Sequence, residues 1–268
     1  MARGAVAARP SESEWRSVPR KVIRGGRLLK AAIFLASLIP AAWLLWAALT
    51  GHLSANPLSD VTNETGIWTL RFLCITLSVT PLRRLTGWNG VIRFRRMIGL
   101  FAFFYGTLHL LTYVILDRFA GLDFPNGIVA WRTVRDLTIS VGKDVYERPF
   151  ITLGFAAFMS MVPLAATSTA GMLRRLGGRN WQLLHRLVYV TAIAGVIHYW
   201  WGVKADVQRP LAYAVVVGLL LAFRMVWARG YFRAAAPKGR RVAASNPDRQ
   251  PWGSGAVEAV KNAEPREP

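Results

Sequence analysis

Long apolar runs are the feature that most constrains this chain of 268 residues. Several are near the length that a helix needs to cross about 30 Å of hydrocarbon, at about 1.5 Å per residue. Inside a bilayer the backbone must satisfy its own hydrogen bonds, which a helix does. The chain is also 53% hydrophobic and contains 11 tryptophans, more than an average soluble domain has. We therefore predict an all-α, polytopic membrane protein.

The apolar runs predict a bundle of six transmembrane helices that occupies residues 28–227. The second run is short and contains Arg71. The flanking segments, 1–27 and 228–268, are rich in Arg, Pro, Ala, Gly and Ser, and we expect both to be disordered and cytoplasmic. Helical spacing of apolar residues within 117–148 predicts a short interfacial helix. The predicted spans are 28–49, 66–82, 97–116, 149–167, 183–201 and 211–227.

Basic residues set the predicted orientation, because Lys and Arg collect in cytoplasmic loops. The N-terminal segment, every second connection and the C-terminal tail are strongly basic, whereas the intervening connections are mixed. Both termini are therefore predicted to be cytoplasmic. This distribution accounts for most of the net charge of +20, so the charge does not indicate nucleic-acid binding. The basic connections contain Arg83, Arg84, Arg93, Arg95, Arg96, Arg174, Arg175 and Arg179.

The single cysteine, Cys74, falls inside an apolar run. One thiol excludes an internal disulfide, a cysteine-bound iron–sulfur cluster and a CxxCH attachment site for haem within this chain. Any haem here would be held non-covalently, by histidine.

Three of the four histidines lie within predicted spans, where polar side chains are costly and usually face the bundle interior. His109 is about 12 residues, or roughly 18 Å, from the cytoplasmic start of its span. His198 is about 15 residues, or roughly 22 Å, from the start of its own. Two histidines at one depth on different helices predict the axial ligands of a b-type haem. His52, at the end of the first span, is a residue of the interface.

His185 is about 20 Å from His198 along a continuous helix, and the two side chains would lie roughly 140° apart around it. Either the helix deforms, with Gly195 as a candidate position, or His185 faces a different partner. A fourth histidine is missing, because Arg95 and Arg96 stand where it would lie. The residues therefore predict one complete bis-histidine site and one half-site. The half-site could hold a second haem with one protein ligand, a flavin or a quinone, and His185 could alternatively bond a lipid headgroup.

Arginines near these histidines are candidate cofactor-binding residues. Arg71 could pair with haem propionates, or could snorkel to the interface. Arg95, Arg96 and Arg186 could bind propionates or another anionic cofactor, or could serve as basic anchors at the membrane face. No nucleophile, carboxylate pair or hydrolytic metal motif is visible, so we assign no catalytic residue to the chain.

Four segments carry a family resemblance: "GIWTLRFLCITLSVTPLRRLTG" (66–87), "RFRRMIGLFAFFYGTLHLLTYVILD" (93–117), "ERPFITLGFAAFMSMVPLAATS" (147–168) and "LRRLGGRNWQLLHRLVYVTAIAGVIHYWW" (173–201). Together they resemble the haem-binding subunit of the bacterial protein-methionine-sulfoxide reductase system, the MsrQ or YedZ family, within the ferric-reductase-like transmembrane group. The resemblance covers about residues 60 to 227. The TPLRR turn, the RRxxGL…H helix and the WxxxHRLxY…H helix occur in order.

The resemblance implies a multi-pass protein of the bacterial inner membrane that binds one or two b-type haems, with FMN or a quinone as a further cofactor. It implies that His109, His185 and His198 are the haem-associated histidines. Electrons would come from the quinone pool or a flavin reductase. They would leave to a periplasmic molybdopterin-containing methionine sulfoxide reductase, which repairs oxidised envelope proteins.

Two other functions remain open on the sequence. Related oxidases and ferric reductases add a large nucleotide-binding domain, but here about 40 polar residues follow the last span, without a glycine-rich nucleotide loop. The electron donor would therefore be a separate protein or molecule. The first alternative is a stand-alone haem-dependent reductase of ferric iron or another small acceptor. The second is a transporter or assembly protein that binds no haem.

Overall fold

The computed structural model describes residues 20–119, 131–203 and 206–235 of the chain. Every element in these ranges is helical, which confirms the predicted all-α class. The chain divides into two units, Met1–Arg224 and Met225–Pro268. All contacts discussed below lie within the first unit.

Within the described ranges, five helices are long and apolar enough to span a membrane. A sixth apolar helix, α8, has 16 residues and is shorter than the other spans. The chain is thus a multi-pass transmembrane helical protein. The five long spans lie in α2 (Arg20–Thr50), α3 (Pro57–Thr86), α4 (Arg95–Leu111) with its helical continuation to Ile115, α6 (Pro149–Ala166) and α9 (Gln208–Ala235), and α8 is Leu187–Gly202.

The second span, which hydropathy predicts as a short run, is a helix of 30 residues that begins nine residues before the predicted start. Its first turn is polar and therefore invisible to hydropathy, but it is well capped. The Asn56 side chain accepts a hydrogen bond from the Ser59 amide at 3.2 Å, and Pro57 occupies the first helical position. Gly87, at φ 71°, ends the helix in the left-handed conformation that glycine favours.

The connections also contain helical segments. A 3-10 turn, η1 (Asn89–Arg93), precedes α4, and a π-helical stretch, η2 (Thr112–Phe119), continues it. Helix α5 (Trp131–Glu147) lies where a short helix is predicted. Helix α7 (Ala170–Leu184) occupies what the sequence predicts as a basic loop. Its first turn is capped by Thr169 Oγ1, which accepts from the Met172 amide at 3.2 Å, and its hydropathy is too low to stand out.

Helices α2 and α9 extend eight residues beyond the predicted limits of the bundle, to Arg20 and Ala235 respectively. The remainder of both predicted disordered segments, 1–19 and 236–268, lies outside the described residues.

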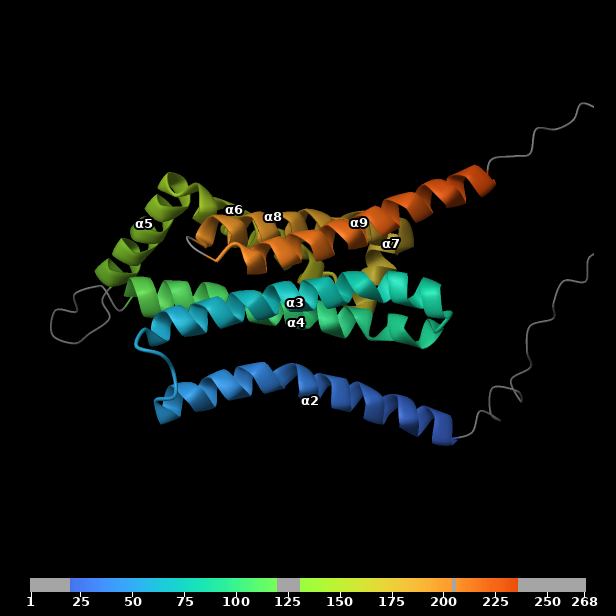
Figure 1. Cartoon of the computed structure of the whole chain (residues 1–268), viewed down its shortest axis with the longest axis horizontal. Helices are drawn as coiled ribbons and strands as arrows, with labels where there is room; N and C mark the ends of the chain where they lie inside the picture. Colours follow the sequence, from blue (N-terminus) through green and yellow to red (C-terminus); the bar gives the residue numbers. More distant parts are fainter. Residues whose placement is uncertain (1–19, 120–130, 204–205, 236–268) are drawn as a thin grey trace, which may run out of the picture. The chain divides into compact units, whose positions relative to one another are not determined.

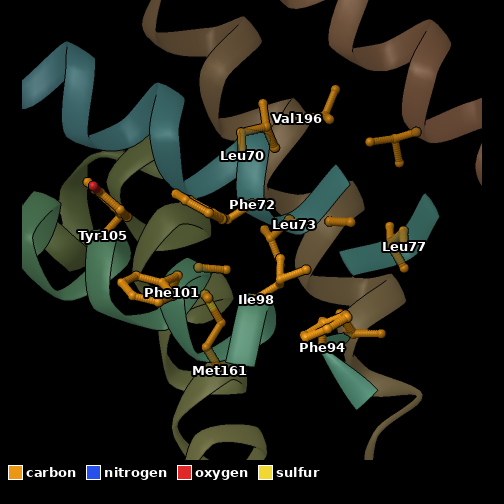
Figure 2. Close-up of a cluster of buried hydrophobic side chains, with 14 residues drawn as sticks. Leu70, Phe72, Leu73, Leu77, Phe94, Ile98, Phe101, Tyr105, Met161 and Val196 are labelled. Carbon is orange, nitrogen blue, oxygen red and sulfur yellow. The ribbon is translucent and has the colours of Figure 1, made fainter. Parts of the chain in front are cut away.

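Two helix pairs form the centre of the first unit: α3 lies along α4, and α6 lies along α8 (Figure 1). Their buried faces meet in one hydrophobic core, to which α9 adds Val217. Figure 2 shows Phe72 of α3, Phe101 and Tyr105 of α4, and Met161 of α6 within this cluster. The rings of Phe72 and Tyr105 stack with centroids 5.2 Å apart. This packing holds the helices that carry the histidines.

Candidate functional site

A cavity of about 400 Å³ opens between α3, α4, α6 and α8 and contains both His109 and His198. We call it the dihistidine cavity. Its volume falls in the range of about 300–1,000 Å³ that is usual for cofactor pockets. Apart from the histidines its wall is mostly apolar, with Leu70, Phe155 and Phe158 among its residues.

The structure brings together the two histidines that the sequence pairs by depth. The imidazole centroids of His109, on α4, and His198, on α8, lie 6.1 Å apart, with an angle of 79° between the ring planes. A metal–imidazole bond of about 2 Å on each side would put two opposed imidazole centroids roughly 6 Å apart. The ring separation therefore suits two axial ligands of one metal.

Hydrogen bonds to the backbone orient both rings. His109 Nδ1 lies 2.9 Å from the carbonyl oxygen of Thr62, and His198 Nδ1 lies 2.6 Å from that of Phe150. Because a carbonyl oxygen only accepts hydrogen bonds, each Nδ1 carries the proton and each Nε2 keeps a lone pair. This is the arrangement that prepares a histidine to bind a metal through Nε2.

Two glycines let the helices approach these rings closely. A Cβ added to Gly66 of α3 would lie 3.1 Å from the His109 ring, and one added to Gly154 of α6 would lie 2.6 Å from His198 Cε1. The second distance is shorter than non-bonded carbon atoms tolerate. The two positions therefore form a cradle that any larger residue would fill.

The donor set also fits a haem. Among the described residues, no group of three or more His, Cys, Asp or Glu side chains is placed to hold a metal ion. Two imidazoles supply the axial pair of a six-coordinate iron, and a porphyrin supplies the remaining ligands. The two imidazoles of the dihistidine cavity thus fit the ligands that a haem takes from a protein.

A second cavity, of about 460 Å³, contains His185 together with Arg95, Arg96 and Arg186. We call it the arginine cavity. Its lining has three arginines and no carboxylate, so its chemistry favours an anionic ligand. The sequence names all four residues as candidates for one half-site, and the structure places them around one cavity.

His185 is held by the end of α7 and not by α8. The helix predicted over 183–201 is wrong at this point, because α7 ends at Leu184, His185 and Arg186 form a turn, and α8 begins at Leu187. The Arg186 amide donates to the Leu183 carbonyl, a three-residue bond that tightens the chain. The break removes the angular conflict between His185 and His198, since they do not share one straight helix.

Trp181 positions His185 in turn. Its indole stacks on the imidazole with centroids 3.8 Å apart, and its carbonyl oxygen lies 3.0 Å from His185 Nδ1. The indole Nε1 donates to the carbonyl of Thr167 at the end of α6, 2.9 Å away. Arg96 donates to the next carbonyl, that of Ser168, through both Nε and Nη2. These hydrogen bonds connect two residues that line the arginine cavity, Trp181 and Arg96, to the C-terminal end of α6.

The two cavities share a wall made by Leu73, Met161 and Thr191. All three side chains are buried. Thr191 Oγ1 lies 2.5 Å from Ser160 Oγ, which joins α8 to α6 within this wall. The two candidate sites are therefore adjacent compartments of one helix bundle.

The remaining candidate, Arg71, lines neither cavity. Its guanidinium lies 4.4 Å from the centroid of the Trp68 ring, and its Nε donates to Tyr213 Oη at 3.2 Å. Its role as a propionate partner stays a prediction. The arginine that does line the dihistidine cavity is Arg148. Sequence reasoning missed it, and the available signal was its position directly before the predicted fourth span.

The sequence alone also does not indicate that Gly66, Gly154 and the carbonyls of Thr62 and Phe150 belong to the site. Glycines inside a span carry a weak signal, since helical spacing alone does not say which helix they approach. A backbone carbonyl carries no signal in the sequence at all, because every residue has one.

These features define a class: a multi-pass helical membrane protein with paired intramembrane histidines. Residues 65–196 match the family described as ferric reductase like transmembrane component.

Relatives narrow the class to one family. The chain is 49% identical to the protein-methionine-sulfoxide reductase heme-binding subunit MsrQ of Ralstonia nicotianae, over 84% of this chain and 96% of that protein. It is 48% identical to the proteins of the same name from Herminiimonas arsenicoxydans, over 75% of this chain and 86% of the relative, and Rhodospirillum rubrum, over 75% and 88%. The chain belongs to the MsrQ family, as the sequence motifs predict.

Proposed function

We propose that this chain is the haem-binding electron-transfer subunit of a bacterial system that reduces methionine sulfoxide in periplasmic proteins. The observation that carries the proposal is the pairing of His109 and His198, with ring centroids 6.1 Å apart and both Nδ1 atoms bonded to backbone carbonyls. The printed names of the relatives, which describe heme-binding subunits of a protein-methionine-sulfoxide reductase, point the same way.

In this proposal His109 and His198 would hold a haem b in the dihistidine cavity. A haem so ligated supplies one-electron redox chemistry. The chain's own residues do the rest. The Thr62 and Phe150 carbonyls orient the imidazoles, the two glycines leave room for them, and the apolar wall excludes water.

The arginine cavity is the proposed entry site for electrons. His185, Arg95, Arg96 and Arg186 would hold an anionic or hydrogen-bonding cofactor there: a second haem, FMN or a quinone. The donor would be the quinone pool or a flavin reductase. Leu73, Met161 and Thr191 line both cavities and form the wall between them.

The partner in this proposal is a periplasmic molybdopterin-containing methionine sulfoxide reductase subunit. The terminal reduction would take place there, and for that reason we assign no catalytic residue to this chain. The protein would lie in the bacterial inner membrane with both termini in the cytoplasm, as the distribution of Lys and Arg predicts.

Visible spectroscopy of three variants tests the proposal. We expect the purified protein to show the reduced-minus-oxidised bands of low-spin haem b. His109→Ala and His198→Ala should each abolish the low-spin spectrum, because each removes an axial ligand. His185→Ala should retain it, because His185 lies in the other cavity. Wild-type protein without b-type bands, or a spectrum lost only in His185→Ala, would refute the assignment and favour a transporter or assembly protein.

The match to ferric reductase like transmembrane components keeps a second function in view, a stand-alone reductase of ferric iron or another small acceptor. Reoxidation kinetics separate the two. The dithionite-reduced protein should be reoxidised by the methionine sulfoxide reductase subunit and its substrate, and not by ferric chelates alone. The reverse result would support the stand-alone reductase.

A further inference from the structure

Arg148 is the cation of the dihistidine cavity. It stands between the last residue of α5, Glu147, and the first of α6, Pro149. Among the described residues that line this cavity, it is the one Lys or Arg, and none is Asp or Glu. A cavity built mostly from apolar side chains therefore has a single positive charge at its edge, directly before the helix that contains Gly154.

Two residues hold this arginine in place. Its Nε lies 3.3 Å from Asp144 Oδ1, and Asp144 Oδ2 accepts a hydrogen bond from Tyr113 Oη at 2.5 Å. The Asp144 side chain is buried, whereas that of Arg148 is 53% exposed. Tyr113 also lines the cavity and follows His109 by one helical turn. The buried carboxylate thus fixes one edge of the guanidinium and links it to the helix that bears His109.

The Nη groups of the guanidinium are the donors that a ligand would meet. Within the described part of the chain, Asp144 is the acidic side chain that pairs with Arg148, and the recorded contact is with Nε. A guanidinium presents its Nη–H groups as a fork that binds a carboxylate through two parallel hydrogen bonds. A partly exposed ion pair by itself contributes about 0–1 kcal/mol, too little to explain why a carboxylate is buried to hold it.

We propose that Arg148, positioned by Asp144 and Tyr113, binds the carboxylate groups of the ligand in the dihistidine cavity. The inference rests on the proposed function, in which that ligand is haem b, a macrocycle with two propionate groups on one edge. Arg148 thereby determines how the macrocycle is oriented between His109 and His198. Arg71, the propionate partner predicted from the sequence, lines neither cavity and serves below as the comparison.

Haem with and without free carboxylates tests the proposal. Purified full-length protein is depleted of haem in detergent and reconstituted with haem or with haem dimethyl ester, and loss to a haem scavenger is followed in the Soret band. A charge-assisted hydrogen-bond pair corresponds to about a 10- to 100-fold difference in retention. We expect Arg148→Met to shorten the retention of haem by that factor and to leave the retention of the ester almost unchanged. Arg148→Lys, which keeps the charge without the fork, should be intermediate.

Arg71→Met is the matched control, because it removes another arginine of the same bundle. It should change the retention of haem and of ester by the same factor. Asp144→Asn should reproduce part of the Arg148→Met effect, again on haem and not on ester. If Arg148→Met weakens haem and ester equally, or neither, the proposal is overturned while the haem assignment stands. If the wild-type protein binds neither form with a low-spin spectrum, the proposed function fails and this inference fails with it.

Discussion

At the scale of single residues, the site consists of two imidazoles together with the backbone groups and glycines that surround them. His109 and His198 each point Nδ1 at a backbone carbonyl and pack against a glycine. A carbonyl acceptor selects the tautomer that leaves Nε2 free for a metal. Because glycine has no Cβ, the space that a Cβ would fill is left to the imidazole ring.

Gly154→Ala is expected to displace His198. The added Cβ would lie 2.6 Å from His198 Cε1, and overpacking of this kind costs about 1–3 kcal/mol. Because the imidazole is the group that must move, we expect the low-spin haem spectrum of the purified protein to be lost. Gly66→Ala, with its closest contact at 3.1 Å, should have a weaker effect.

Gly195→Ala is the control for these substitutions. This glycine lines the same cavity, but its added Cβ would meet Leu70 Cδ1 at 3.5 Å, an ordinary contact. Its spectrum should match that of the wild type. Equal loss of the spectrum in Gly195→Ala and Gly154→Ala would contradict the steric explanation.

At the scale of helices, one hydroxyl ties α2 to the rest of the bundle. Tyr105 of α4 is fully buried; its Oη donates to the Ser37 carbonyl at 2.8 Å and accepts from the Ala41 amide at 3.1 Å. Ser37 and Ala41 are the i and i+4 residues around Pro40, where a proline weakens the helical ladder. The Tyr105 hydroxyl thus hydrogen-bonds to the two backbone groups beside Pro40. It is a side chain inserted into the hydrogen-bond ladder of a helix.

Tyr105→Phe should therefore weaken the attachment of α2 without disturbing the haem site. When a buried polar group loses its hydrogen-bond partner, the free energy of unfolding falls by about 1–3 kcal/mol. We expect a lower thermal midpoint for the detergent-solubilised protein and an unchanged low-spin spectrum. Tyr146→Phe, at a side chain that is 90% exposed, should leave the midpoint unchanged. An unchanged midpoint in Tyr105→Phe would show that the ladder closes again without the hydroxyl.

At the scale of the whole molecule, orientation decides which cavity faces the cytoplasm. The basic connections predict that the α3–α4 connection is cytoplasmic and the α2–α3 connection periplasmic. The dihistidine cavity would then lie toward the periplasm and the arginine cavity toward the cytoplasm, in the order that the proposed function requires.

Cysteine labelling in cells tests this orientation. The chain has one native cysteine, Cys74, so Cys74→Ser provides a cysteine-free background. In that background, Ala55→Cys and Asn89→Cys place single thiols at exposed positions of the two connections. A membrane-impermeant maleimide should label the first in cells with a permeabilised outer membrane, and the second only after lysis. The reverse pattern would invert the predicted topology.

Much of the fold could be predicted because hydropathy registers the energy of placing side chains in lipid. That signal located the spans and paired His109 with His198 by depth. It failed where the helix was polar or the apolar run was continuous. Hydropathy did not indicate the capped start of α3 or most of α7, and the break at His185 lies inside an apolar stretch.

The sequence by itself determined the class of protein, the approximate positions of its spans and, through its motifs, the family, and it singled out the three histidines of the two candidate sites. The tertiary structure decided which of these residues share a cavity. It placed His185, Arg95, Arg96 and Arg186 around one cavity, left Arg71 out of both, and brought Arg148 to the edge of the other. The reason is physical. Membrane depth follows from a residue's position along its own helix. The direction in which a side chain faces depends on packing between helices. Close approaches such as that at Gly154 involve residues that are distant in sequence.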